Sequence, residues 1–362
     1  MMMETRASKK KRANTNQKPQ LVVPKRHRVV FPNIPHLNVR VYQTRQRLKS
    51  QINPNLKNST TTKTLPLLHN SNSNKPVHNK TNGECDHQQI IETYVSDIDD
   101  HHRTMEVQKK RRPTVGYIEN IQKEVTINMR GTLVDWLVKV ADKHKLLPET
   151  LHLCISYIDR FLSLQSVNET NLALVGVSSM LIAAKYEEIT PPKAVVFCKI
   201  AKNAYGLSEV LKMEVDILKS LKYEIGNPNV TTFLKRFVGL ACGNQKNSDL
   251  QFEYLCNYLA DLSLLEYECI RFLPSVVAAS VIFLARFIIQ PEVDPWTPSL
   301  CECLGYKSSE LKECVAILHD LYFSRRAASL KTLRNKYNRK KLKSVANLPS
   351  PPEVPTHYFK EA

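Results

Sequence analysis

Two segments, residues 174–188 and 275–289, are apolar on nearly every face of a helix and align at an offset of 101 positions. A helix that is apolar all round is a buried central helix. Recurrence at a fixed offset indicates two copies of one helical domain. Both copies end in a cation beside an aromatic residue: Lys185–Tyr186 and Arg286–Phe287.

The repeat continues upstream of these central segments. Leu133 aligns with Leu234 at the same offset, and Asp159 aligns with Asp261 at an offset of 102. A slip of one residue corresponds to a change in loop length. Any two amphipathic helices align somewhere, but three segments that agree in order and offset favour a duplication.

The apolar periodicity predicts an all-α protein, with a break between two sets of helices at Gly226–Asn227–Pro228. The first set is expected over 116–125, 128–145, 148–164, 169–186, 192–202 and 207–222, and the second over 229–242, 249–262, 266–289, 297–304 and 308–326. Residues 88–107 form a weaker helix, because Asp99 to His102 are poor helix formers. It needs a partner or the following domain to hold it.

These elements divide the chain into five parts. We expect a disordered basic tail over 1–83, a helix and lead-in over 84–127, two helical domains over 128–227 and 228–345, and a Pro-rich tail over 346–362.

The net charge of +18 is concentrated in the tail. Residues 1–80 hold 17 Lys/Arg and one acid, which leaves 35 Lys/Arg and 33 acids, or +2, for the rest. The predicted fold is therefore nearly neutral, and no direct nucleic-acid binding is expected.

Cysteine and motif content argue against a cofactor, a metal site or an enzyme. The nine cysteines are scattered and lack zinc spacing, so we interpret them as reduced thiols. No phosphate loop, HExxH or GxSxG motif occurs. We expect no signal peptide, because the charged residues at the start are not followed by an apolar stretch, and no membrane span, because the apolar stretch 272–285 is shorter than the roughly 20 residues needed.

Charged residues inside the apolar helices point to one ion pair and one binding edge. Arg130 and Asp159 are each costly to bury alone, so we expect them to pair across two helices. Glu187 and Glu188 lie at the end of the first central helix. The aligned positions in the second copy are both isoleucine. The repeat itself does not require these acids, which suits the rim of an interface.

Four long segments resemble the cyclin box of A-type cyclins: MRGTLVDWLV, ETLHLCISYIDRFL, LVGVSSMLIAAKYEEITPP and VLKMEVDILKSLKYEIGNP. FLPSVVAASVIFLARF and LPSPPEVP are most similar to the plant A-type group, and the likeness runs from about 88 to 345. It implies two tandem five-helix cyclin folds behind a short N-terminal helix. It also implies a non-catalytic subunit that binds and activates a cyclin-dependent kinase between S phase and mitosis.

The resemblance also assigns roles to individual residues of this chain. The kinase contacts fall on Tyr94, Lys185, Tyr186, Glu187, Glu188 and Glu214. The groove that docks Arg-x-Leu substrates falls on Met129, Arg130, Leu133 and Trp136. Arg130 and Asp159 match the family's buried ion pair.

Departures from the family pattern predict weaker substrate docking. Thr132, Lys139 and Ala173 replace an aliphatic residue, Glu and Gln, and Lys139 repels a basic peptide. His101–His102 replaces an aromatic residue and Leu, which weakens the N-terminal helix further.

The basic tail carries two short motifs. RQRLKSQIN places Arg45, Leu48 and Asn53 in the destruction-box pattern that the anaphase-promoting ubiquitin ligase recognises. The cluster Lys9, Lys10, Lys11 and Arg12 is interpreted as a nuclear import signal, with a solvated charge run as the alternative. We expect a protein of the nucleus and cytoplasm.

Two alternatives remain open. A double cyclin fold can also serve as a DNA-binding transcription factor; DNA affinity of residues 84–362 falling steeply with salt would favour it. A B-type cyclin is the closer alternative, but ITPP after KYEE favours the A type.

Overall fold

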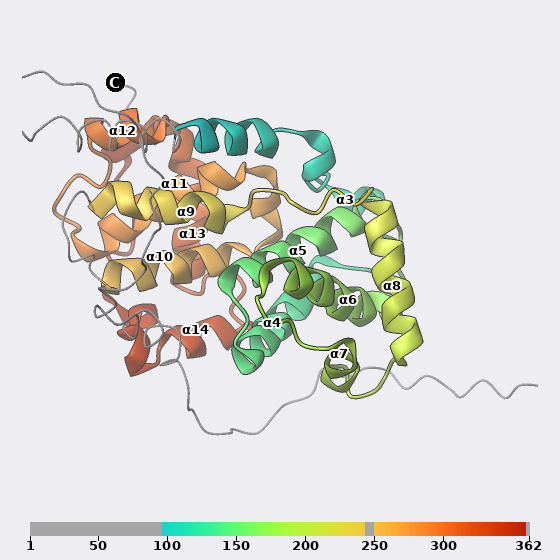
Figure 1. The fold of residues 1–362 in the computed structure, drawn as a ribbon. Coiled ribbons are helices and arrows are strands. Elements are labelled where there is room, and N and C mark those ends of the chain that lie inside the picture. The colour runs from blue at the N-terminus through green and yellow to red at the C-terminus, as the bar shows by residue number, and fades with distance from the viewer. Residues whose placement is uncertain (1–95, 243–249, 360–362) are drawn as a thin grey trace, which may run out of the picture.

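The computed structural model describes residues 96–242 and 250–359, and within these ranges all regular secondary structure is helical. Two five-helix bundles lie side by side (Figure 1), which confirms the predicted fold class. The first contains α4 (Ile127–His144), α5 (Pro148–Leu162), α6 (Glu169–Glu187), α7 (Ala194–Ile200) and α8 (Leu207–Ser220). The second contains α9 (Val230–Cys242), α10 (Leu250–Ser263), α11 (Pro274–Ile289), α12 (Pro298–Leu304) and α13 (Ser308–Tyr322).

Helix α6 is the core of the first bundle and contacts α4, α5, α7 and α8. Its side chains from Leu172 to Ala184 are all buried, as its uniform apolar character predicts. Gly176 allows α4 to approach closely, because a methyl group there would lie 2.8 Å from Leu133. Alanine at this position would require the buried Leu133 side chain to shift.

Helix α11 has the same place in the second bundle and packs on α9, α10 and α13. The single helix predicted over 266–289 is wrong in its first turns. A 3-10 helix, η2 (Tyr267–Arg271), precedes α11, which starts at Pro274. Proline fits a first helical position because it has no N–H to donate. Among the described residues, no helix combines the length and apolar character needed to cross a membrane.

The segment before α4 is less helical than predicted. Instead of a helix over 116–125 there is one turn, α3 (Tyr117–Asn120), after the short η1 (Lys109–Arg111). Thr126 then caps α4 by accepting a hydrogen bond from the Met129 amide at 3.3 Å. This cap fixes where α4 begins.

The N-terminal helix, residues 96–106, lies along the second bundle (Figure 1). Asp99 forms ion pairs with Arg103 and with Arg236 of α9. Arg103 also donates to the Leu304 carbonyl oxygen at 2.9 Å. Buried Glu106 accepts from the Ser275 amide at 3.0 Å, at the start of α11. The second bundle therefore holds this intrinsically weak helix.

The chain after α13 folds back over both bundles. Helix α14 (Thr332–Tyr337) packs on α4, and three 3-10 turns follow: η3 (Lys340–Leu342), η4 (Val345–Asn347) and η5 (Thr356–Phe359). The Phe359 ring stacks on Phe283 of α11, with centroids 5.1 Å apart. Most of the segment expected as a Pro-rich tail thus packs on the second bundle.

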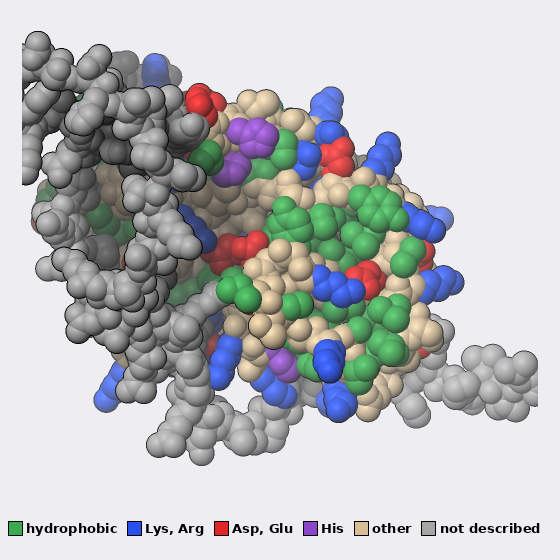
Figure 2. Space-filling model, in the orientation of Figure 1, with side chains coloured by type: hydrophobic (Ala, Val, Ile, Leu, Met, Phe, Trp, Pro, Cys, Tyr) green, Lys and Arg blue, Asp and Glu red, His purple; other side chains and the backbone are tan. Residues whose placement is uncertain are grey.

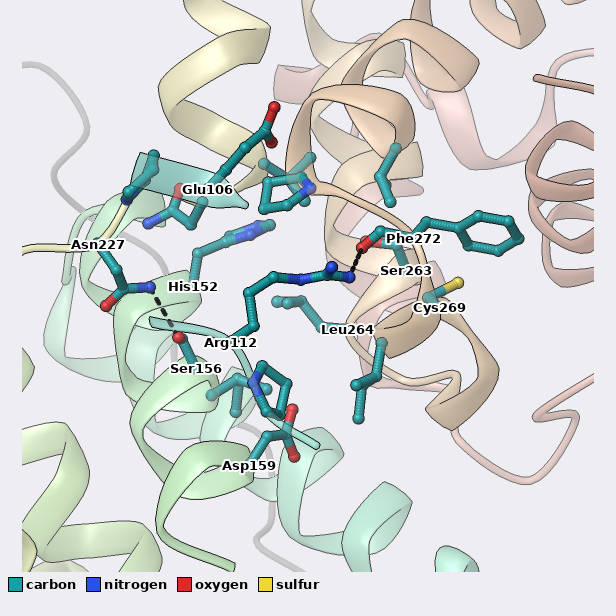
Figure 3. A pocket seen from close by; sticks show the side chains of 18 of the residues that line it. Glu106, Arg112, His152, Ser156, Asp159, Asn227, Ser263, Leu264, Cys269 and Phe272 are labelled. Atoms are coloured by element: carbon teal, nitrogen blue, oxygen red, sulfur yellow. Dashed lines mark hydrogen bonds between the residues drawn. The ribbon is translucent and has the colours of Figure 1, made fainter. Parts of the chain in front are cut away.

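The bundles meet around a cavity of about 120 Å³ (Figure 3). Arg112 reaches across it from the lead-in and donates to the Phe272 carbonyl oxygen at 3.2 Å. Asn227, in the connection between the bundles, donates to Ser156 of α5 at 2.9 Å. Polar contacts as well as apolar packing therefore join the two domains.

Candidate partner-binding face

A charged pair links the last turn of α6 to the middle of α8. Lys185 Nζ lies 2.6 Å from Glu214 Oε1. The side chain of Glu214 is nearly buried, whereas that of Lys185 is half exposed. Residues 29 positions apart in the chain thus form one site, with the lysine presented to solvent and the carboxylate holding it in place.

The three residues after Lys185 have different surroundings. Tyr186 is half exposed, and a methyl group on Gly226 would lie 2.7 Å from its hydroxyl oxygen. Burial and the neighbouring carboxylates of Glu149 and Glu188 raise the pKa of Glu187. Glu188 points back into the domain and accepts hydrogen bonds from the Leu147 amide and the Thr150 hydroxyl, each at 2.7 Å.

Glu188 therefore caps the N-terminus of α5. Its carboxylate satisfies an amide that has no intrahelical partner at the first helical positions. Of the two acids predicted at the binding edge, only Glu187 lacks such a fixed role within the fold. This difference could not be predicted from the pattern of residues, because the acceptor and its donors lie about 40 positions apart in the chain.

Exposed apolar side chains occur on the same helices as the Lys185–Glu214 pair, and on α7 and the chain next to them. Figure 2 shows hydrophobic side chains gathered over the part of the molecule that carries α6, α7 and α8. Ile189 is 84% exposed and Tyr223 is 65% exposed. The other large exposed members are Tyr186, Val195, Leu207, Leu211 and Val215. Contiguous exposed apolar side chains of this kind mark an interaction surface.

Sequence reasoning missed most of this patch, although a signal was present in α8. The buried stripe of that helix is Val210, Glu214 and Ile217. Leu211 and Val215, four residues apart, form a second apolar stripe that no core position requires. A helix with apolar residues on two faces buries one in its own domain and offers the other to a partner.

The residues assigned to substrate docking divide between the core and the surface. Met129 is partly exposed, Leu133 is fully buried and Trp136 is almost buried. Arg130 is only 2% exposed, so its guanidinium is not part of a surface groove. It faces the interior because α4 turns it toward α5.

The departures from the family pattern lie near the same helix face. Lys139 is exposed and its Nζ lies 3.0 Å from Asp135 Oδ2, one turn earlier. Thr132 donates to the Asn128 carbonyl oxygen at 2.9 Å, and Ala173 is buried. Asp135 partly balances Lys139, but no described acid replaces the family's glutamate at this position.

Arg130 and Asp159 form a buried, two-pronged ion pair between α4 and α5. Arg130 Nε lies 2.8 Å from Asp159 Oδ1, and Nη2 lies 2.7 Å from Oδ2. The Tyr117 hydroxyl donates to Oδ1 at 2.9 Å, and Arg130 Nη1 donates to the Leu264 carbonyl oxygen at 2.9 Å. Asp159 raises the pKa of Arg130 against the effect of burial, so the guanidinium is permanently charged.

Several predicted site residues lie outside the described residues. They are Tyr94, the motif residues Arg45, Leu48 and Asn53, and the cationic cluster Lys9, Lys10, Lys11 and Arg12. His101 and His102 are described: His102 meets the Phe233 edge at a centroid distance of 6.2 Å. Burial and the neighbouring His101 lower the pKa of His102, which favours its neutral form against the ring.

Comparison with known proteins supplies the family. The Cyclin, N-terminal domain model matches residues 97–226, and the Cyclin, C-terminal domain model matches residues 228–351. The putative cyclin-A3-1 of Arabidopsis thaliana is 46% identical, over 99% of this chain and 96% of its own. The G2/mitotic-specific cyclin C13-1 of Daucus carota is 53% identical, over 76% of this chain and 81% of its own.

The fold has a counterpart among solved structures. The viral cyclin of herpesvirus saimiri aligns with a TM-score of 0.55 at 18% identity, and the match covers 66% of this chain and 98% of that protein. The two domain models together span both helical bundles. The chain therefore belongs to the cyclin family, a family of regulatory proteins rather than enzymes, and its relatives place it with the plant A-type cyclins.

Proposed function

We propose that this cyclin binds and activates a cyclin-dependent serine/threonine kinase through the face formed by α6, α7 and α8. The observation that carries the proposal is the Lys185–Glu214 pair at 2.6 Å, set among exposed apolar side chains. These charged residues match the kinase-contacting Lys and Glu of the family. An apolar core with a charged rim is the composition of a protein–protein interface.

The proposed mechanism is mechanical rather than chemical. The apolar patch takes up an amphipathic helix of the kinase, and Lys185 meets its polar groups at a fixed position because Glu214 holds the ammonium. Binding then moves the kinase C-helix and activation segment into their active arrangement. The cyclin supplies binding free energy to the active state and takes no part in phosphoryl transfer.

Kinase pull-down tests this proposal. Full-length protein is incubated with a panel of purified cyclin-dependent kinases, and bound kinase and histone phosphorylation are measured. We expect Lys185→Ala/Glu214→Ala to weaken kinase binding by at least about thirtyfold and to lower histone phosphorylation with it, since a hot-spot truncation costs at least about 2 kcal/mol and the effects of two residues in contact do not simply add. Retained activation by the double variant would overturn the site.

A matched control separates this face from a general loss of charge. Lys312 and Glu302 are exposed on the second bundle and remove one cation and one acid when replaced by alanine. Lys312→Ala/Glu302→Ala is expected to bind and activate the kinase as the wild type does. Circular dichroism of both double variants verifies that they are folded.

Substrate docking through Met129, Leu133 and Trp136 is proposed to be weak. Lys139 presents a cation where an Arg-x-Leu peptide brings its arginine, and Leu133 is already buried. Fluorescence anisotropy with such peptides measures the affinity. Tight binding that Leu133→Ala abolishes would contradict weak docking.

Destruction through Arg45, Leu48 and Asn53 is proposed from the sequence pattern, with action between S phase and mitosis and import through Lys9–Arg12. The name of the Daucus carota relative, which is mitotic-specific, supports the timing. We expect Arg45→Ala/Leu48→Ala to lengthen the half-life in mitotic extract several-fold by removing both receptor anchors. Decay at the wild-type rate would show that another segment directs degradation.

A further inference from the structure

A pocket of about 320 Å³ lies where the lead-in, the end of α5 and the end of α8 meet. Five of its lining residues are lysine or arginine, and one is acidic. The cations come from separate parts of the chain: Lys109, Lys110 and Arg112 from the lead-in, Arg160 from α5, and Lys222 after α8. Three of them belong to the basic run at 109–112, and folding brings Arg160 and Lys222 to the same cavity.

Arg160 lies at this pocket with only 2% of its surface exposed. Nη1 donates to Asn227 Oδ1 at 3.2 Å, and Nη2 donates to the carbonyl oxygens of Lys110 and Glu224 at 3.0 and 2.9 Å. Nε has no acceptor. The guanidinium of Arg160 therefore donates to neutral amide and carbonyl oxygens and not to a carboxylate, and its Nε–H donor has no acceptor.

The acid that lines the pocket is already paired with two other cations. Glu224 Oε1 lies 2.6 Å from Lys110 Nζ, and its Oε2 lies 2.8 Å from Arg111 Nη2. Within 96–242 and 250–359, no carboxylate lies within ion-pair distance of Arg160, Lys109 or Lys222. Three cations therefore line the cavity without forming an ion pair within these ranges.

This arrangement is costly for the free protein. Burial and the nearby charge of Arg111 lower the pKa of Arg160 to about 10, although the Glu224 carboxylate acts in the opposite direction. A buried charge without a partner destabilises a fold unless a counter-charge arrives. By contrast, Arg130 on the neighbouring helix is also buried and has a carboxylate on two of its nitrogens.

We infer that this pocket binds a phosphate group, with Arg160 at its base and Lys109 and Lys222 at its rim. A phosphate carries close to two negative charges at neutral pH and several strong acceptor oxygens, which suits one buried donor and two mobile ammonium groups. Arg112 lines the same pocket, but its Nη2 is held by the carbonyl oxygens of Arg271 and Phe272, so the test variants are placed at the two lysines. The group arrives either as free phosphate or on a phosphorylated serine or threonine side chain.

Calorimetric titration of the full-length protein tests the site without a kinase. The probes are inorganic phosphate and a phosphoserine peptide beside its unphosphorylated form, at one fixed salt concentration. We expect Lys109→Ala/Lys222→Ala to weaken phosphate binding by at least about tenfold, through the loss of two charge-assisted contacts. Equal affinity in wild type and this variant would overturn the proposal, because binding would then lie elsewhere, for example on the basic residues 1–80.

Charge-matched and buried variants complete the design. Lys193→Ala/Lys312→Ala removes the same charge from exposed positions outside the pocket and is expected to leave the affinity unchanged. Arg160→Gln is expected to abolish the phosphate-induced rise in Tm; if it fails to fold, the rim variant decides. Tighter binding of the phosphopeptide than of phosphate identifies a phosphorylated side chain as the source, and equal binding identifies the free ion.

Discussion

Replacing Arg130 with methionine is expected to lower the free energy of unfolding by about 3–5 kcal/mol. The change removes both nitrogens that bind Asp159 and leaves that carboxylate buried with only the Tyr117 hydroxyl as its donor. It also leaves the Leu264 carbonyl oxygen without its donor across the domain junction. Urea unfolding followed by circular dichroism measures the loss.

A second variant distinguishes the effect of the unpaired buried charge on stability from the effect of lost packing. Arg130→Met/Asp159→Leu removes both charges and keeps apolar volume between α4 and α5, so it is expected to recover much of the stability. Tyr117→Phe added to this pair removes the hydroxyl that would otherwise lose its acceptor. An Arg130→Met protein less than about 1 kcal/mol below wild type would contradict an essential ion pair.

Asp261 is expected to make the stability of this cyclin fall in acid. It is 2% exposed and accepts hydrogen bonds from Lys336 at 3.0 Å, Tyr337 at 2.9 Å and His152 at 3.2 Å. Burial alone raises the pKa of Asp261, but Lys336 and His152 together hold it below its ordinary value. A lowered pKa means that the ionised form stabilises the folded state.

The sign of the effect follows from this lowered pKa. The contribution of Asp261 is complete above its unfolded pKa of about 3.9 and is lost as the pH falls through the folded pKa. At pH 7, Asp261→Asn leaves Lys336 without a counter-charge and is expected to cost about 3 kcal/mol. The difference between wild type and Asp261→Asn should therefore shrink below about pH 4, as measured by urea unfolding at a series of pH values. A constant difference from pH 7 to pH 2 would mean that the carboxylate charge has no part in it.

The fold was largely predictable because it rests on the two uniformly apolar helices α6 and α11, which allow few environments other than a buried centre. The pairing of Arg130 with Asp159 was predictable for a related reason, since neither charge is tolerable alone in an apolar helix. Asp261 aligns with Asp159 in the repeat, yet its partners could not be foreseen. Lys336 lies in the short helix α14, beyond the repeated helices, and the sequence there has no apolar periodicity from which the helix could be predicted.

The candidate binding face also has one part that could be predicted from the sequence and one part that could not. The Lys185–Glu214 pair came from the resemblance, which assigns both residues to one contact. The inward turn of Glu188 and the exposed Leu211–Val215 stripe depend on which way a side chain leaves its helix end or face. The burial of Arg160 at a pocket was not predicted. The segment that contains it, ETLHLCISYIDRFL, is mostly apolar, and packing in the core accounts for its pattern.

The contacts across the domain junction also bear on how the molecule comes apart. Arg130 of the first bundle holds the Leu264 carbonyl oxygen of the second, and His152 of the first holds Asp261 of the second. The segment at α14 returns to α4, where Thr332 donates to Asp135. Neither bundle keeps its buried polar groups satisfied when the other unfolds, so heating should produce one calorimetric transition rather than two. The two bundles have a similar arrangement, yet the contacts at their junction make them one cooperative folding unit, and either half expressed alone is expected to be unstable.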